Sequence, residues 1–176
     1  MKNIKEIIYN HILINYSRKL IFISLIFITS CVWGAVYQSY QPSIDIHPSN
    51  YSWVNYFIHN IKQSTISFLL GIVTYGILSI ILLVLTGISI GIGIVLTMQN
   101  DLNSTILTAF LPHALFEIPA IILTCLSPFI FWRFLIVSIK HRKIQYQIIK
   151  MEALPVLSSI IILLFIASIM ESIFSL

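Results

Sequence analysis

Apolar residues in this chain occur in long runs that short polar segments separate. A charge-free run covers about residues 20–38, close to the roughly 20 residues that a helix needs to cross a membrane. Two longer runs follow at 63–100 and 105–139, and a last one covers 154–175. The runs lack the alternation of lipid-facing and lumen-facing residues that is typical of barrel strands, so they predict membrane-spanning helices.

The run at 63–100 is too long for a single straight span. As one helix it would measure roughly 57 Å, nearly twice the thickness of the hydrocarbon layer. Thr86 and Gly87 interrupt its leucine-rich part. We therefore predict a second helix at about 64–85 and a short third helix at 88–99.

The run at 105–139 is also overlong, and it contains the motif "LPHALFEIPA" at 111–120. Pro112 suits the first turn of a helix, where its missing N–H has no partner to lose. Pro119 weakens a helix locally, because it lacks a donor and its ring clashes with a carbonyl one turn earlier. We therefore predict that the helix over 105–139 is broken near this motif, the alternative being that the stretch lies partly along the membrane interface.

Three polar segments connect or precede these runs. Residues 3–17 have apolar positions near helical spacing, which predicts a short helix on the inner membrane surface, with a frayed terminus as the alternative. Residues 38–62 predict an external loop, and the basic segment 140–152 predicts a cytoplasmic loop. The external loop ends in aromatic residues that suit the outer headgroup boundary: Trp53, Tyr56 and Phe57.

Composition supports the same class. Hydrophobic residues make up 58% of the 176 residues, charged residues only 9%, and the mean hydropathy is +0.96. Soluble domains carry about a quarter charged residues, so this chain could not cover a water-exposed surface. We predict an all-α, polytopic helical membrane protein forming one integral membrane domain over 1–176, with lipids as its first partners.

The positions of the positive charges indicate which side of the membrane each flank faces. Eight of the ten basic residues flank the first run or lie between the last two, which excludes a nucleic-acid surface and predicts that both flanks are cytoplasmic. Arg133 is close enough to the end of its run to reach the inner headgroups. The predicted inner-surface anchors are Arg18, Lys19, Arg133, Lys140, Arg142 and Lys143.

An even number of crossings must separate the two cytoplasmic flanks. Four crossings before residue 140 and one after it give five helices, an N-terminus inside and a C-terminus outside. The alternative folds residues 86–126 into a re-entrant hairpin and leaves three true spans.

The ionisable residues within the apolar runs need partners or a role. His113 and Glu117 are four residues apart and share one helical face, and Glu171 also falls near the outer side. One interpretation is structural: His113 hydrogen-bonds Glu117 or a freed carbonyl and so stabilises the helix break. The other interpretation is a polar site in the outer leaflet. Such a site would bind a partner, move protons or act as a catalytic pair.

The glycines and the two cysteines give less information about function. Gly71, Gly76, Gly87 and Gly91 are candidates for close helix packing. The two cysteines lie in apolar runs and form no metal-ligand pair, so we expect neither a metal nor a cofactor.

Three stretches resemble one known family. "LPHALFEIPAIIL" is similar to the Pro-His-Gly-x-x-Glu-[Ile/Leu]-Pro-Ala signature of the stage II sporulation protein M family. "HNIKQSTISFLLGIVTYGILSIILLVLTGISIG" and "FIASIMESIFS" resemble two further landmarks of that family. The chain departs from the pattern at Ala114 and at Thr86-Gly87, where the family has Gly and Asn-Gly. The residues that carry over are Pro112, His113, Glu117, Pro119, Ala120 and Glu171.

The resemblance implies a bacterial cell-membrane protein with about five helices. Sporulation members anchor peptidoglycan-degrading enzymes during engulfment, and compact relatives occur in circular bacteriocin gene clusters. The expected function is therefore a non-enzymatic subunit in bacteriocin maturation, secretion or immunity, with membrane proteins or a hydrophobic peptide as partners and a homo-oligomer possible. The alternatives are the sporulation anchor, an intramembrane protease or cyclase using His113 and Glu117, and a proton-coupled exporter.

Overall fold

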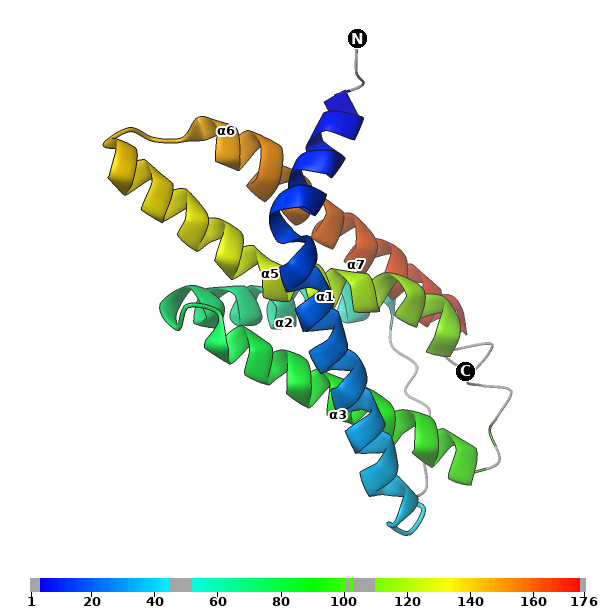
Figure 1. Cartoon of the computed structure of the whole chain (residues 1–176). Coiled ribbons are helices and arrows are strands. Elements are labelled where there is room, and N and C mark those ends of the chain that lie inside the picture. Colours follow the sequence, from blue (N-terminus) through cyan, green and yellow to red (C-terminus); the bar gives the residue numbers. More distant parts are fainter. Residues whose placement is uncertain (1–3, 45–51, 101, 103–109, 175–176) are drawn as a thin grey trace.

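The computed structural model of the chain describes residues 4–44, 52–100, 102 and 110–174, and its regular elements there are helices (Figure 1). This confirms the all-α class. The elements in chain order are α1 (Ile4–Ser39), α2 (Trp53–Val73), α3 (Ile77–Gln99), α5 (Leu111–His141), α6 (Tyr146–Ile148), the π-helical segment η2 (Ile149–Ala153) and α7 (Leu154–Phe174).

Four helical segments in the described part of the chain are long and apolar enough to cross a membrane. They are Tyr16–Ser39, Ile77–Gln99, Leu111–His141 and Tyr146–Ile173. Helix α2 is also 21 residues long, but its first half is more polar and carries His59 and Lys62. The prediction of a polytopic helical membrane protein is thus confirmed.

Helix α1 is longer than predicted. It runs without interruption for 36 residues, so the separate surface helix predicted at 3–17 and the spanning helix at 20–38 are one element. Its first thirty residues contain neither proline nor glycine, which explains why no break separates them. The side chains before Tyr16 lie outside the described residues.

The break predicted at Thr86–Gly87 is wrong, because the chain reverses at 74–76. Tyr75 and Gly76 both take left-handed backbone angles, with φ of 54° and 92°, and the Gly76 N–H donates to the Gly71 carbonyl at 2.7 Å. This is the hydrogen bond of a Schellman ending. Helix α3 continues through Thr86, whose hydroxyl bonds the Leu82 carbonyl at 2.9 Å.

The break predicted within 105–139 is also wrong for the described residues. Helix α5 is continuous for 31 residues through Pro119 and Pro128. Pro128 frees the carbonyl of Thr124, and the Ser127 hydroxyl donates to that oxygen at 2.7 Å. Hydroxyl side chains that satisfy freed carbonyls let a membrane helix contain proline. The residues at 103–109 lie outside the described part.

The loops differ from the prediction as well. The loop predicted at 140–152 shrinks to 142–145, since helical structure resumes at Tyr146 and continues to Phe174. Arg142 closes α5 in a left-handed conformation (φ 49°), and the Lys143 N–H donates to the Ser138 carbonyl at 3.1 Å. The second half of the loop predicted at 38–62 is the first half of α2, which includes the three aromatic residues expected at the surface.

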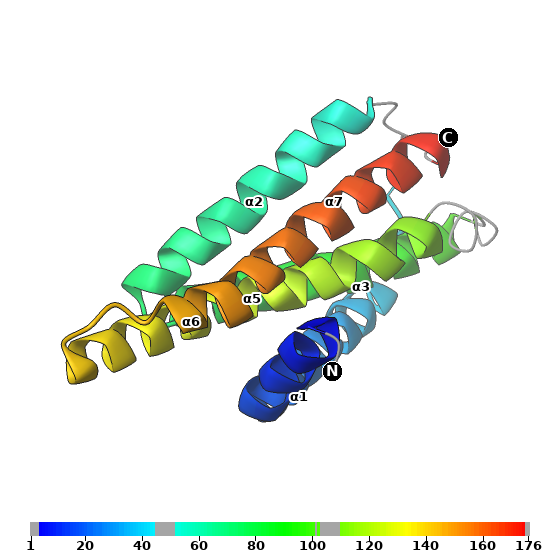
Figure 2. The ribbon, with the colours of Figure 1, turned by 90° about the horizontal axis from the view of Figure 1, so that it is seen from above.

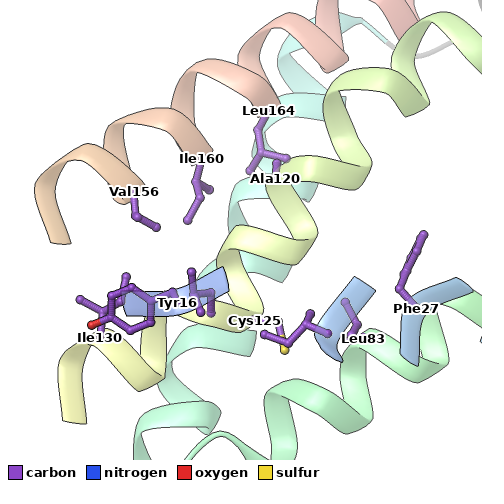
Figure 3. Packing of buried hydrophobic residues seen from close by; sticks show 11 residues of the cluster. Tyr16, Phe27, Leu83, Ala120, Cys125, Ile130, Val156, Ile160 and Leu164 are labelled. Atoms are coloured by element: carbon purple, nitrogen blue, oxygen red, sulfur yellow. The ribbon is translucent and has the colours of Figure 1, made fainter. Parts of the chain in front are cut away.

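The helices pack as two antiparallel hairpins crossed by α1 (Figures 1 and 2). Helices α2 and α3 form one hairpin, α5 and α7 form the other, and α2 lies along both α5 and α7. Helix α1 packs mainly on α3. The shared core contains Ile23 and Phe27 of α1, Leu83 of α3, and apolar residues of α5 and α7 (Figure 3).

The glycines make the α1–α3 contact close. A Cβ atom at Gly91 would collide with backbone atoms of Cys31 and Ala35, and one at Gly87 would press on Ser30. On the α1 side, Gly34 lies against the backbone of Ile88. These glycine faces are therefore covered within the chain and are not available to another protein.

The hairpins define two ends of the molecule. The turn at 74–76 and the loop at 142–145 lie at one end, and the start of α2 and the C-terminal end of α7 lie at the other (Figure 2). We call these the basic end and the distal end. At the distal end, the amide of Gln99 donates to the carbonyls of Gln38 and Gln41, which joins the ends of α1 and α3.

Candidate functional site

The predicted pair His113 and Glu117 occupies the first two turns of α5 at the distal end. Pro112 lies in the first turn, as predicted, and Pro119 follows inside the continuous helix. The His113 Nε2 and Glu117 Oε2 atoms are 4.0 Å apart, with 16% and 24% of the two side chains exposed. That separation is longer than the 2.6–3.2 Å of a proton-transfer contact. The pair is therefore held close without a direct hydrogen bond.

Glu171 comes to the same end of the molecule. Helix α7 runs antiparallel to α5, which brings the Glu171 carboxyl within electrostatic range of Glu117. His113 also packs edge-to-face against Phe110, with ring centroids 5.4 Å apart. The structure thus groups the three ionisable residues of the motif.

A polar cavity extends from Glu117 into the helix bundle. It has a volume of about 30 Å³, enough for about two water molecules. Helix α2 contributes a polar stripe at helical spacing, α3 contributes two hydroxyls, and α5 contributes Glu117 with one hydroxyl. The polar side chains that line it are Asn60, Gln63, Ser64, Ser67, Ser79, Thr86, Glu117 and Thr124.

Several of these polar groups are hydrogen-bonded within the chain. The Ser79 hydroxyl donates to the Ser67 carbonyl at 2.5 Å, and Thr124 donates to the Ala120 carbonyl at 2.8 Å. The Gln63 amide donates to the Thr86 hydroxyl at 3.2 Å and so links α2 to α3. Asn60, by contrast, is only 8% exposed and its amide nitrogen has no acceptor.

The cavity continues into a larger open groove between α3 and α5. The groove has a volume of about 510 Å³ and shares Gln63, Leu82, Thr86 and Glu117 with the cavity. Its remaining walls are mostly apolar. They consist of Leu85, Ser89, Ile90, Gly93 and Phe110. A Cβ atom at Gly93 would meet nothing within 4 Å, so this wall is open.

Sequence reasoning missed the α2 side of this site. Residues 60–62 were placed in an external loop, so the polar stripe that begins at Asn60 was not seen as one face of a helix. The spacing Asn60, Gln63, Ser64, Ser67 follows a helical repeat, and this signal could have found it.

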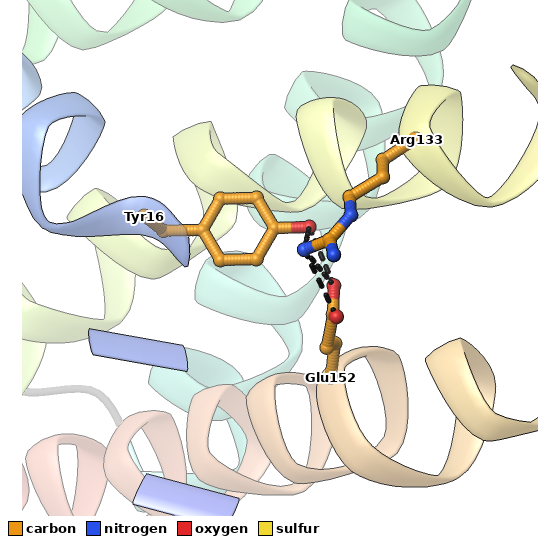
Figure 4. A network of polar contacts seen from close by, with 3 residues as sticks. All are labelled: Tyr16, Arg133 and Glu152. Atoms are coloured by element: carbon orange, nitrogen blue, oxygen red, sulfur yellow. Dashed lines mark hydrogen bonds and ion pairs between the residues drawn. The ribbon is translucent and has the colours of Figure 1, made fainter. Parts of the chain in front are cut away.

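A second polar network lies toward the basic end (Figure 4). The Tyr16 hydroxyl donates to Glu152 Oε2 at 2.6 Å, and Arg133 Nη1 lies 3.0 Å from Glu152 Oε1. Tyr16 and Glu152 are fully buried. Arg133, predicted as an inner-surface anchor, also pairs with a carboxylate that the sequence analysis did not connect to it. Glu152 was overlooked because it was placed in a loop instead of the helical segment η2.

The other predicted inner anchors have exposed side chains. Arg18 and Lys19 lie near the start of the first spanning segment, and the rest flank the 142–145 loop: Lys140, Arg142 and Lys143. Lys19 Nζ lies 5.0 Å from the centre of the Phe129 ring. These cations surround the basic end.

The described residues contain no group of three His, Cys, Asp or Glu side chains placed to hold a metal ion. Cys31 and Cys125 are both free thiols. The polar side chains of the cavity offer hydrogen bonds and charge, and the Cys125 thiol also borders it.

Comparison with known proteins supports the resemblance seen in the motif. Residues 22–176 match the family model for stage II sporulation protein M. No curated protein and no solved structure matches the chain. The match covers most of the chain and includes all three resembling stretches, so the chain belongs to the stage II sporulation protein M family.

Proposed function

We propose that this chain is a non-enzymatic, multi-pass subunit of a bacterial cell-membrane complex that binds a hydrophobic peptide, in the maturation, secretion or immunity of a circular bacteriocin. The observation that carries the proposal is the open groove between α3 and α5. Its volume of about 510 Å³ lies in the range of ligand sites, and its walls are apolar around a polar base.

The groove differs from an ordinary lipid-facing surface. Acyl chains cannot hydrogen-bond, so a carboxyl, an amide and a hydroxyl at the base of a lipid-filled groove would lose interactions that water supplies elsewhere. Glu117, Gln63 and Thr86 form this base. A partner that is apolar along its length and polar at one point fits it better than lipid does.

The partner surface is therefore different from the one that glycine spacing suggested. Gly87 and Gly91 pack against α1, whereas Leu85 of the same helix is 55% exposed and borders the groove. We expect contacts with the peptide on the Leu85 face of α3.

Site-specific photo-crosslinking in the producing cells tests this. A photoreactive phenylalanine analogue replaces Leu85 in the groove, and a matched variant carries it at Leu69, an equally exposed position of α2 outside the groove. We expect a crosslinked peptide or a second membrane protein from position 85 and none from position 69. Equal products from both positions, or lipid alone from position 85, would contradict the proposal.

The alternative function is an anchor for peptidoglycan hydrolases in sporulation, the process that the family description names. The same experiment separates the two. A small hydrophobic peptide crosslinked at position 85 supports the bacteriocin function, and a large enzyme captured there supports the anchor.

A further inference from the structure

The buried Asn60 amide is an unused hydrogen-bond donor inside the bundle. It lines the polar cavity, its side chain is more than nine-tenths buried, and its nitrogen has no partner. Leaving such a buried donor unpaired is unfavourable, because the group loses the hydrogen bonds that water would give it in the unfolded chain. A donor kept at that cost points to an acceptor that arrives from outside the chain.

Glu117 lines the same cavity and offers an acceptor there. Among the described residues, no hydrogen-bond donor reaches its carboxyl group, and His113 Nε2 is 4.0 Å away. The neighbouring hydroxyls of Ser79 and Thr124 already donate to backbone carbonyls. The Asn60 donor and the Glu117 acceptor are therefore both available to a ligand in this cavity.

We propose that Asn60 and Glu117 form a binding site for a backbone amide of an apolar peptide segment that lies in the α3–α5 groove and enters the polar cavity at its base. A peptide group presents one N–H and one C=O, which match the Glu117 carboxylate and the Asn60 amide. This inference rests on the proposed function, since it names the chemistry by which the groove recognises its peptide.

A non-helical peptide segment gains most from such a site. Within the membrane, backbone groups outside a helix have no water to bond, so a protein group that pairs with them is strongly favourable. The groove offers apolar contact along Leu85 and Ile90 and hydrogen-bonding groups at its base.

The test uses the full chain in phospholipid nanodiscs and a capped decapeptide of leucine and alanine that carries one photoreactive leucine. A matched set of analogues replaces one amide at a time by an ester, which removes the N–H. We expect crosslinks to the α3–α5 groove, and about tenfold less product from at least one ester analogue, the effect of one lost hydrogen bond.

Variants separate recognition from folding. Asn60→Leu removes an unpaired donor, so we expect a thermal stability no lower than wild type together with about tenfold weaker crosslinking. Glu117→Leu loses the ester discrimination, whereas Glu117→Gln keeps it because the carboxamide retains an acceptor oxygen. Thr65→Val is the control, since Thr65 bonds only the Ile61 carbonyl of its own helix.

Three results would overturn this inference: crosslinking of Asn60→Leu at the wild-type level, equal yields from every ester analogue, or crosslinks outside the groove. The proposed function is judged separately by what position 85 captures in cells. Capture of a partner there by the Asn60→Leu variant would retain the proposed function and remove the amide site.

Discussion

At the scale of single residues, the buried charges show how this bundle joins elements that are distant in sequence. Glu152 has no exposed surface, and its carboxylate is held by Tyr16 from α1 and Arg133 from α5. An isolated carboxylate at that depth would be strongly unfavourable, so its two partners must be in place when the helices associate. The network therefore fixes how α1, α5 and η2 lie against one another.

Arg133→Leu should destabilise the protein by about 3 kcal/mol, because it removes the opposite charge beside a buried carboxylate. Tyr16→Phe should cost about 1.5 kcal/mol, the usual effect of losing a hydrogen bond to a charged group. The double variant Arg133→Leu with Glu152→Leu should recover most of the stability. Thermal unfolding in detergent measures all three.

Lys140→Leu serves as the control for these variants, since Lys140 is an exposed cation near the end of the same helix. If the double variant were as unstable as Arg133→Leu, the pairing with Glu152 would not explain the loss.

At the scale of helices, the pattern of apolar residues predicted the positions of the helices better than the positions of the turns between them. The runs near 20–38 and 154–175 correspond to α1 and α7, but the second helix break was misplaced. Thr74-Tyr75-Gly76 and Thr86-Gly87 both offer glycine after a threonine within the same apolar run. What separates them is tertiary contact: Tyr75 stacks on Trp132 at 4.0 Å, and Gly87 lies against α1.

In the candidate site as well, some residues could be predicted from the sequence and others could not. His113 and Glu117 were recognisable because charges are rare in apolar runs, and their helical spacing placed them together. Asn60 is uncharged and lies in a sequence that reads as an aromatic, polar loop. Its importance depends on the missing hydrogen-bond partner, which only a three-dimensional structure reveals.

The two neighbouring glycines of α3 provide a matched test of the α1–α3 contact. Gly91→Ala should destabilise the protein by about 2 kcal/mol, because the added methyl group meets backbone atoms of Cys31 that cannot rotate away. Gly93→Ala should be neutral or stabilising, since its Cβ meets nothing and alanine favours the helix. Equal effects of the two substitutions on thermal unfolding would contradict close packing at Gly91.

At the scale of the whole molecule, charge and polarity separate toward opposite ends. Three exposed cations lie at or beside the 142–145 loop, Lys140, Arg142 and Lys143, and the polar motif of α5 lies at the distal end. If the basic end faces the cytoplasm, α2 must cross with the four more apolar helices, which gives five crossings. We propose this orientation, with the N-terminus inside and the C-terminus outside.

Cysteine labelling tests the orientation and the re-entrant alternative together. With Cys31 and Cys125 replaced by alanine, single cysteines are placed at four exposed positions: Tyr40, Tyr75, Leu102 and Ile144. In intact cells, an impermeant thiol reagent should label positions 40 and 102, and it should reach 75 and 144 only after permeabilisation. Position 102 is decisive, because a re-entrant hairpin over 86–126 would return it toward the inner side. Labelling at 40 but not at 102 in intact cells would reject the five-crossing arrangement, and with it the placement of the Glu117 groove in the outer half of the membrane.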